Sequence, residues 1–108
     1  MIDASFRLQK LIEMEQNNPA DPFIKFALAQ EYYAKNDLEN AEKYYAVLLR
    51  HFPDYLPTYF HFGKLKQMNG CLDEAKKLFL QGINLAQRQG EAKTHQELLQ
   101  ALGELDDE

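Results

Sequence analysis

The residues of this chain that could do chemistry are few and scattered. Histidine occurs at His51, His61 and His95, and no two of these have the His-x3-His spacing that places two metal ligands together on a helix. The single cysteine, Cys71, has no evident base near it in the sequence. We therefore expect no metal, no cofactor and no catalytic nucleophile. We interpret His61 as part of the scaffold and Cys71 as an incidental thiol.

Acidic side chains are more abundant, but they stand where a helix starts or where the chain ends. Asp73-Glu74 follows a predicted turn, and Asp106-Asp107 lies in the acidic tail. The sequence has no phosphate-binding glycine loop, no nucleophile elbow and no zinc-ligand cluster. These patterns predict that the protein is not an enzyme.

Composition narrows the class of protein and its partners. A chain of 108 residues suits one domain, and an apolar share of 45% is enough for a packed core. The formal net charge of -5 disfavours a nucleic-acid partner. No stretch approaches the roughly 20 apolar residues of a membrane span, and the first ten residues lack the apolar core of a signal peptide. We expect a soluble, cytoplasmic protein with no membrane partner and no disulfide framework.

Proline, glycine and short polar turns divide the sequence into segments of helix length. Between these breaks, apolar residues recur at spacings of three and four, which is the period of an α-helix. The breaks fall at residues 17–22, 35–37, 52–57, 69–71 and 88–91. No stretch alternates convincingly at the strand period. The sequence therefore predicts an all-α protein with about six helices.

The sequence contains an internal repeat. NDLENAEKYY (36–45) has the same pattern as GCLDEAKKLF (70–79). The matched apolar pairs, which all have the same offset, are Leu38 and Leu72, Ala41 and Ala75, and Tyr45 and Phe79. A fixed period of roughly 34 residues is typical of helical hairpins that bury their apolar faces against neighbouring hairpins.

Two of the predicted helix starts carry a side chain suited to capping. Asp21 precedes Pro22, which sets the φ angle for a first helical position, and Asp37 precedes the segment that begins at Leu38. In the second copy of the repeated segment, the position that matches Asp37 holds Cys71, a poor cap. We expect side-chain capping at the first two starts and none at the third.

The two copies resemble the tetratricopeptide repeat. The positions that carry the resemblance are large or small apolar residues at fixed offsets. In the first copy they are Leu28, Ala29, Tyr32, Ala41, Tyr45, Leu48 and Pro53, and in the second Tyr59, Phe62, Gly63, Ala75, Phe79 and Gly82. Four positions depart from the family pattern: Lys25, Leu48, Lys66 and Gln87. The resemblance implies a right-handed α-solenoid of antiparallel helix pairs with a capping helix at each end.

The repeat boundaries give a single predicted domain, residues 1–108. Pro19 precedes Pro53 by one full period, so the first segment is expected to be the second helix of a half-repeat. The predicted parts are an N-terminal half-repeat helix at 1–19, repeat 1 at 22–55, repeat 2 at 56–89 and a C-terminal capping helix at 91–105.

The candidate site is the side of each repeat's first helix that the family resemblance places on a concave groove. In that groove, family members bind extended or helical peptides. The candidate residues are Phe23, Phe26, Gln30, Tyr33, Phe60, Lys64 and Gln67. Family members that bind a terminal carboxylate use Lys and Asn side chains, but this chain has Phe26, Gln30 and His61 at the corresponding positions. The sequence therefore predicts a different ligand, such as an amphipathic helix.

Three alternatives stay open, and the third is an enzymatic or metal-binding role through the histidines and Cys71. Phe23 and Phe26 could serve only to pack against the N-terminal helix, in which case they would bind nothing. The second alternative is that the chain assembles with copies of itself, because short repeat arrays leave apolar surface at their ends. The main hypothesis is a non-enzymatic module that binds a protein or peptide partner, and the alternative is a homo-oligomeric scaffold.

Overall fold

The computed structural model describes residues 4–105, so Asp106-Asp107 lies outside the described part of the chain. Within that range the regular structure is helical, with no strand. The helices are α1 (Ala4–Asn17), α2 (Pro22–Ala34), α3 (Leu38–His51), α4 (Pro57–Met68), α5 (Leu72–Gln89) and α6 (Ala92–Leu105). The predicted all-α class and the expected number of helices are confirmed.

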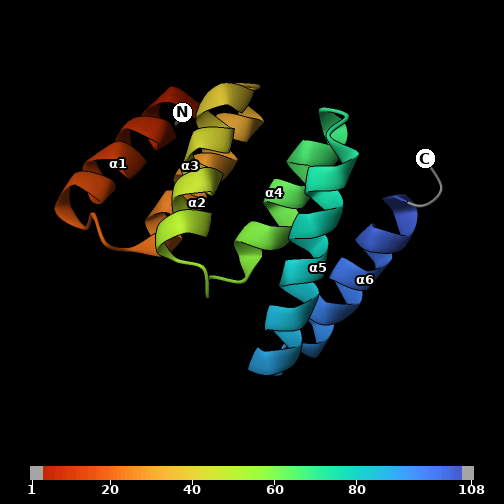
Figure 1. Cartoon of the computed structure of the whole chain (residues 1–108). Coiled ribbons are helices and arrows are strands. Elements are labelled where there is room, and N and C mark those ends of the chain that lie inside the picture. The colour runs from red at the N-terminus through yellow and green to blue at the C-terminus, as the bar shows by residue number, and fades with distance from the viewer. Residues whose placement is uncertain (1–3, 106–108) are drawn as a thin grey trace. The chain divides into compact units, whose positions relative to one another are not determined.

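The helices form two compact units that divide between Pro53 and Asp54. In the first unit, α2 packs against both α1 and α3 (Figure 1). In the second unit, α5 packs against both α4 and α6, and α4 also contacts α6. Each unit thus contains one hairpin of the predicted repeat together with one terminal helix.

The predicted helix caps are present. The Asp21 carboxylate accepts a hydrogen bond of 2.9 Å from the backbone N–H of Phe23, and Pro22 occupies the first position of α2. At the start of α3, Asp37 accepts a bond of 3.2 Å from the backbone N–H of Asn40. Cys71 makes no side-chain capping bond at the start of α5, as expected for a thiol.

The turn inside each hairpin repeats as closely as the sequence does. Asn36 has a φ of 62°, and Gly70, its counterpart in the second copy, has a φ of 79°. Backbone N–H groups then close both turns with bonds of 2.9 Å: Asp37 to the carbonyl of Tyr32, and Cys71 to the carbonyl of Lys66. A left-handed residue followed by this bond is the usual way in which a helix end satisfies its last carbonyl groups.

The core of each unit contains most of the positions that carry the repeat pattern, together with other apolar residues of the same helices. Fully or nearly fully buried side chains in the first unit are Ile24, Leu28, Ala29, Ala41, Tyr45 and Leu48. In the second unit they include Tyr59, Phe62, Leu65, Ala75, Leu78, Phe79, Leu85, Ala86, Leu98 and Ala101. Leu98 and Ala101 come from α6, so the terminal helix completes the apolar core of the second unit.

Two glycines let the helices of the second unit approach closely. A Cβ atom on Gly63 would overlap the ring of Phe79, with only 2.8 Å to its Cδ1 atom. A Cβ on Gly82 would lie 2.7 Å from Cβ of Tyr59 and 3.0 Å from Cδ1 of Leu98. The small residues of the repeat pattern are therefore needed for close helix contact in α4 and α5.

Candidate partner-binding surface

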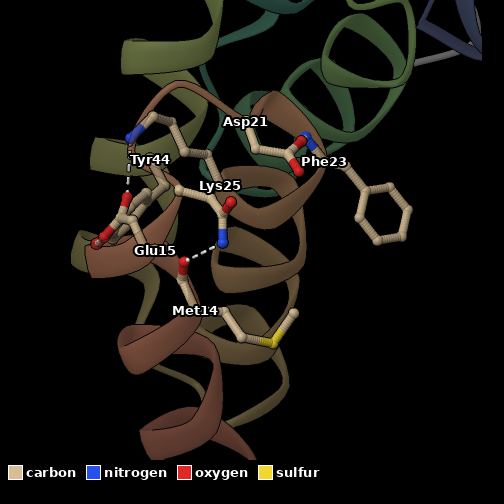
Figure 2. A network of polar contacts seen from close by, with 7 residues as sticks. Met14, Glu15, Asp21, Phe23, Lys25 and Tyr44 are labelled. Carbon is tan, nitrogen blue, oxygen red and sulfur yellow. Dashed lines mark hydrogen bonds and ion pairs between the residues drawn. The ribbon is translucent and has the colours of Figure 1, made fainter.

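The candidate residues of α2 have very different exposures. Phe23 has 65% of its surface exposed and Tyr33 has 44%, whereas Phe26 and Gln30 are half-buried. Phe23 lies two residues after the Asp21 cap, and its ring points away from the polar cluster of Glu15, Lys25 and Tyr44 (Figure 2). The first helix of repeat 1 therefore presents aromatic surface to solvent at both of its ends.

Phe26 is partly committed to the interior of its own hairpin. Its ring centroid lies 6.2 Å from that of Tyr45 on α3, with the ring planes at 58°. Burial raises the pKa of Tyr45 to about 12, while a hydrogen bond with the Gln30 side chain acts in the opposite direction. Phe26 and Gln30 thus contact the same buried tyrosine and keep only part of their surface for a ligand.

The equivalent residue of α4 makes the equivalent contact. Phe60, the counterpart of Phe26 in the second copy, has its ring centroid 6.5 Å from that of Phe79, the counterpart of Tyr45. The Phe60 ring also lies edge-on to the imidazole of His61, with 5.3 Å between the two ring centroids. Burial lowers the pKa of His61, and the carboxylate of Glu97 on α6 opposes that shift. Each hairpin therefore holds its candidate phenylalanine in the same way.

Lys64 and Phe60 lie beside a cavity in the second unit. The cavity has a volume of about 170 Å³ and lies between α4 and α6. It is lined by Phe60, Lys64, Glu97, Gln100, Ala101 and Glu104. The Lys64 ammonium lies 6.0 Å from the Phe60 ring centroid and 3.5 Å from Oε2 of Glu104. Of the predicted residues, Phe60 and Lys64 line this cavity, while Gln67 is half-buried further along α4 and does not.

The acidic residues of this cavity were missed at the sequence level. Glu97 and Glu104 are seven residues apart, a spacing that puts both on one face of α6. That spacing is visible in the sequence, but only the packing of α6 against α4 tells which face meets Phe60. The spacing of the two glutamates could thus be found in the sequence, but their place in the cavity follows only from the tertiary structure.

A second group that the sequence did not predict joins the three helices of the first unit. The Glu15 carboxylate on α1 lies 2.9 Å from the Lys25 ammonium on α2 (Figure 2). The Tyr44 hydroxyl on α3 donates a hydrogen bond of 2.9 Å to the other oxygen of Glu15. Burial, together with that bond, raises the pKa of Tyr44. Lys25 departs from the repeat pattern, and this cluster is the structural reason that a charge is tolerated there.

Lys66, the other lysine that departs from the pattern, is also paired. Its ammonium lies 2.8 Å from Oε2 of Glu74 on α5 and 5.4 Å from the Phe62 ring centroid. In repeat 1 the same position holds Tyr32, whose ring stacks on Tyr44 at 5.8 Å with the planes at 18°. An ion pair thus takes the place of an aromatic stack in the second hairpin.

Other classes of site find no support among the residues that the structure describes. Over residues 4–105, no group of three or more His, Cys, Asp or Glu side chains is arranged to hold a metal ion. No helix of the described chain combines the length and apolar character needed to cross a membrane.

The fold and the matched contacts of the two hairpins define a helical-hairpin repeat domain. A solution NMR structure of a tetratricopeptide repeat domain protein from Salinibacter ruber superimposes with a TM-score of 0.79 at 34% identity, covering 83% of this chain and 91% of that one. A crystal structure of a tetratricopeptide repeat domain protein from the same organism gives 0.77 at 35% identity, covering 80% and 97%. The chain belongs to the tetratricopeptide repeat family.

A longer human protein shares part of this sequence. The protein O-mannosyl-transferase TMTC2 is 35% identical over 63 residues, which are 58% of this chain. The matched segment spans only 8% of that protein's length. No protein-family model matches the chain. Tetratricopeptide repeat domains act generally as protein–protein interaction modules, and their fold neighbours are typically non-catalytic.

Proposed function

We propose that this chain is a non-enzymatic interaction module that binds a peptide or helical segment of a partner protein on the first helix of each repeat. The observation that supports this most is the exposure of aromatic side chains on α2, above all Phe23 at 65%. An aromatic residue this exposed contributes little to the fold, and aromatic residues are frequent anchors in protein interfaces. Phe23, Phe26 and Tyr33 form the aromatic part of the surface in repeat 1.

Phe26 and Phe60 give the proposal its repeated element. Both are half-exposed, and both pack one side of the ring on an aromatic residue of the second helix. A ring held in this way loses little conformational freedom when a ligand covers its other side, which favours affinity. Lys64, the Gln30 amide and the amide nitrogen of Gln67 provide the polar contacts of the proposed surface, since the Gln67 Oε1 atom is buried.

The test begins with a partner identified by affinity capture and mass spectrometry, whose affinity is then measured with purified protein. Phe23→Ala is the decisive variant, because its ring is mostly exposed and its loss should leave the fold intact. We expect the affinity to fall about tenfold, as for an interface anchor. The affinity should fall further in the double variant Phe26→Ala/Phe60→Ala. Circular dichroism verifies that each variant is folded.

The matched control is Leu80→Ala, which removes an exposed apolar side chain of α5, a helix outside the proposed binding surface. It should leave the affinity unchanged. If the Phe23 and the Phe26/Phe60 variants bind as well as the unmodified chain while remaining folded, the assignment to the first helices is wrong.

Self-assembly is the second candidate function, and exposed apolar side chains on the terminal helices favour it. Phe6 and Met14 on α1 and Leu99 on α6 are all exposed. If these surfaces pair, sedimentation velocity should show a concentration-dependent dimer or larger species, and Leu99→Glu should reduce it. A strict monomer at high concentration removes this candidate.

A further inference from the structure

The cavity between α4 and α6 has the chemistry of a site for a cation. One wall is the aromatic ring of Phe60, and the carboxylates of Glu97 and Glu104 belong to the lining on the α6 side. Glu104 is paired with Lys64, and Glu97 forms no ion pair with any of the described residues. The cavity therefore contains a carboxylate whose charge no neighbouring ion pair neutralises.

Lys64 shows that a positive group is stable against this wall. Its ammonium lies within cation–π range of the Phe60 ring and next to the Glu104 carboxylate. The Lys64 side chain is 42% exposed, so it is held loosely enough to shift when another group enters. The Phe60 ring and the Glu104 carboxylate thus already bind one cation, supplied by the chain itself.

We propose that this cavity takes an arginine side chain of the partner segment, with the guanidinium against the Phe60 ring and Glu97 as its counter-charge. The inference rests on the proposed function and names the ligand chemistry of its second-repeat part. Arginine fits better than lysine because its planar group both stacks on an aromatic face and pairs with a carboxylate.

Size and charge agree with this occupant. A volume of about 170 Å³ is the share of roughly six water molecules and is comparable with one long side chain. The net charge of -5 on the whole chain also favours the approach of a basic segment. An acidic ligand would instead meet two carboxylates in the lining.

The test uses acetyl-arginine amide as the probe in an NMR titration of the full ¹⁵N-labelled chain. We expect saturable shifts at the amides of Phe60, Lys64 and Ala101. Acetyl-citrulline amide, which has nearly the same shape without the charge, should not produce them. Glu97→Gln should weaken binding of the arginine probe roughly two- to fivefold, the range for a solvent-accessible pair.

Two further variants make the result specific. Glu39→Gln makes the same change in net charge on α3 and should leave the titration unchanged. Lys64→Gln removes the competing ammonium and should tighten binding of the arginine probe. If arginine and citrulline probes behave alike, if Glu97→Gln has no more effect than Glu39→Gln, or if acetyl-glutamate amide binds instead, the inference is wrong. None of these outcomes depends on the Phe23 variant, so the cavity and the proposed function can fail separately.

Discussion

Glu15 of α1 and Lys25 of α2 form an ion pair of 2.9 Å in which neither side chain is more than 20% exposed. The pair matters because Lys25 occupies a position where the repeat pattern has a bulky residue. The Tyr44 hydroxyl supplies a third member, so a polar cluster connects α1 to both helices of the hairpin.

Loss of Lys25 should weaken the first unit. Lys25→Met leaves Glu15 largely buried without its counter-charge, and we expect the free energy of unfolding to fall by about 1–3 kcal/mol. The exposed pair of Lys10 and Glu13 provides the control. Lys10→Met should change the free energy of unfolding by less than about 0.5 kcal/mol. Urea denaturation measures both. Equal effects of the two substitutions would show that the cluster adds nothing beyond a surface pair.

Replacing a glycine of the second unit by alanine should change the stability of the protein in opposite directions at two positions. Gly103→Ala meets no atom within 4 Å and should stabilise α6 by up to about 1 kcal/mol through helix propensity. Gly63→Ala should destabilise the protein by about 1–3 kcal/mol, because the new methyl group overlaps the Phe79 ring. Thermal denaturation compares them, and adding Phe79→Leu to Gly63→Ala should recover part of the loss. A gain in stability for Gly63→Ala alone would contradict the close contact.

Buried tyrosines should make the protein sensitive to alkali. The pKa of Tyr45 rises from 10.0 to about 12, and burial also raises the pKa values of Tyr44 and Tyr59. Between pH 10 and 12 the folded state keeps the Tyr45 proton and the unfolded state releases it. The stability that protonated Tyr45 contributes is therefore fully present below pH 10. It falls by about 1.4 kcal/mol for each pH unit between pH 10 and 12.

Tyr45→Phe tests this assignment, with denaturant midpoints measured from pH 8 to pH 11.5. The variant should lose less stability with rising pH than the unmodified chain, while Tyr44 and Tyr59 keep some slope. Its stability at pH 8 is the internal control, because the phenol is protonated there in both states. An unchanged slope would mean that Tyr45 releases its proton equally easily in both states.

Much of the fold could be predicted because the signals are local. The proline and glycine breaks bracket the helices within about two residues, and Asp21 and Asp37 cap them as expected. The repeat period located the buried Ala41, Tyr45, Ala75 and Phe79. Each of these features depends on a short segment or on a comparison of two segments.

The candidate site could be predicted only in part. The helical period puts Phe26 and Phe60 on matching faces, but it does not say that each ring packs on Tyr45 or Phe79. Lys25 looked like a defect in the pattern because its partners come from two other helices. Such contacts depend on how far each helix is rotated and shifted against its neighbour, which periodicity leaves undetermined.

The left-handed residues Asn36 and Gly70 also bear on which changes in chain length the hairpins can accept. Each stands at the same place in its turn and fixes the point at which the second helix begins. The bonds that close the turns are made by backbone atoms, so many side chains are compatible with them. If the turn keeps its geometry, one added or deleted residue shifts the sequence of the second helix by one position, which moves its apolar face by about 100° around the helix axis. The hairpin depends on the length of this connection more than on its composition.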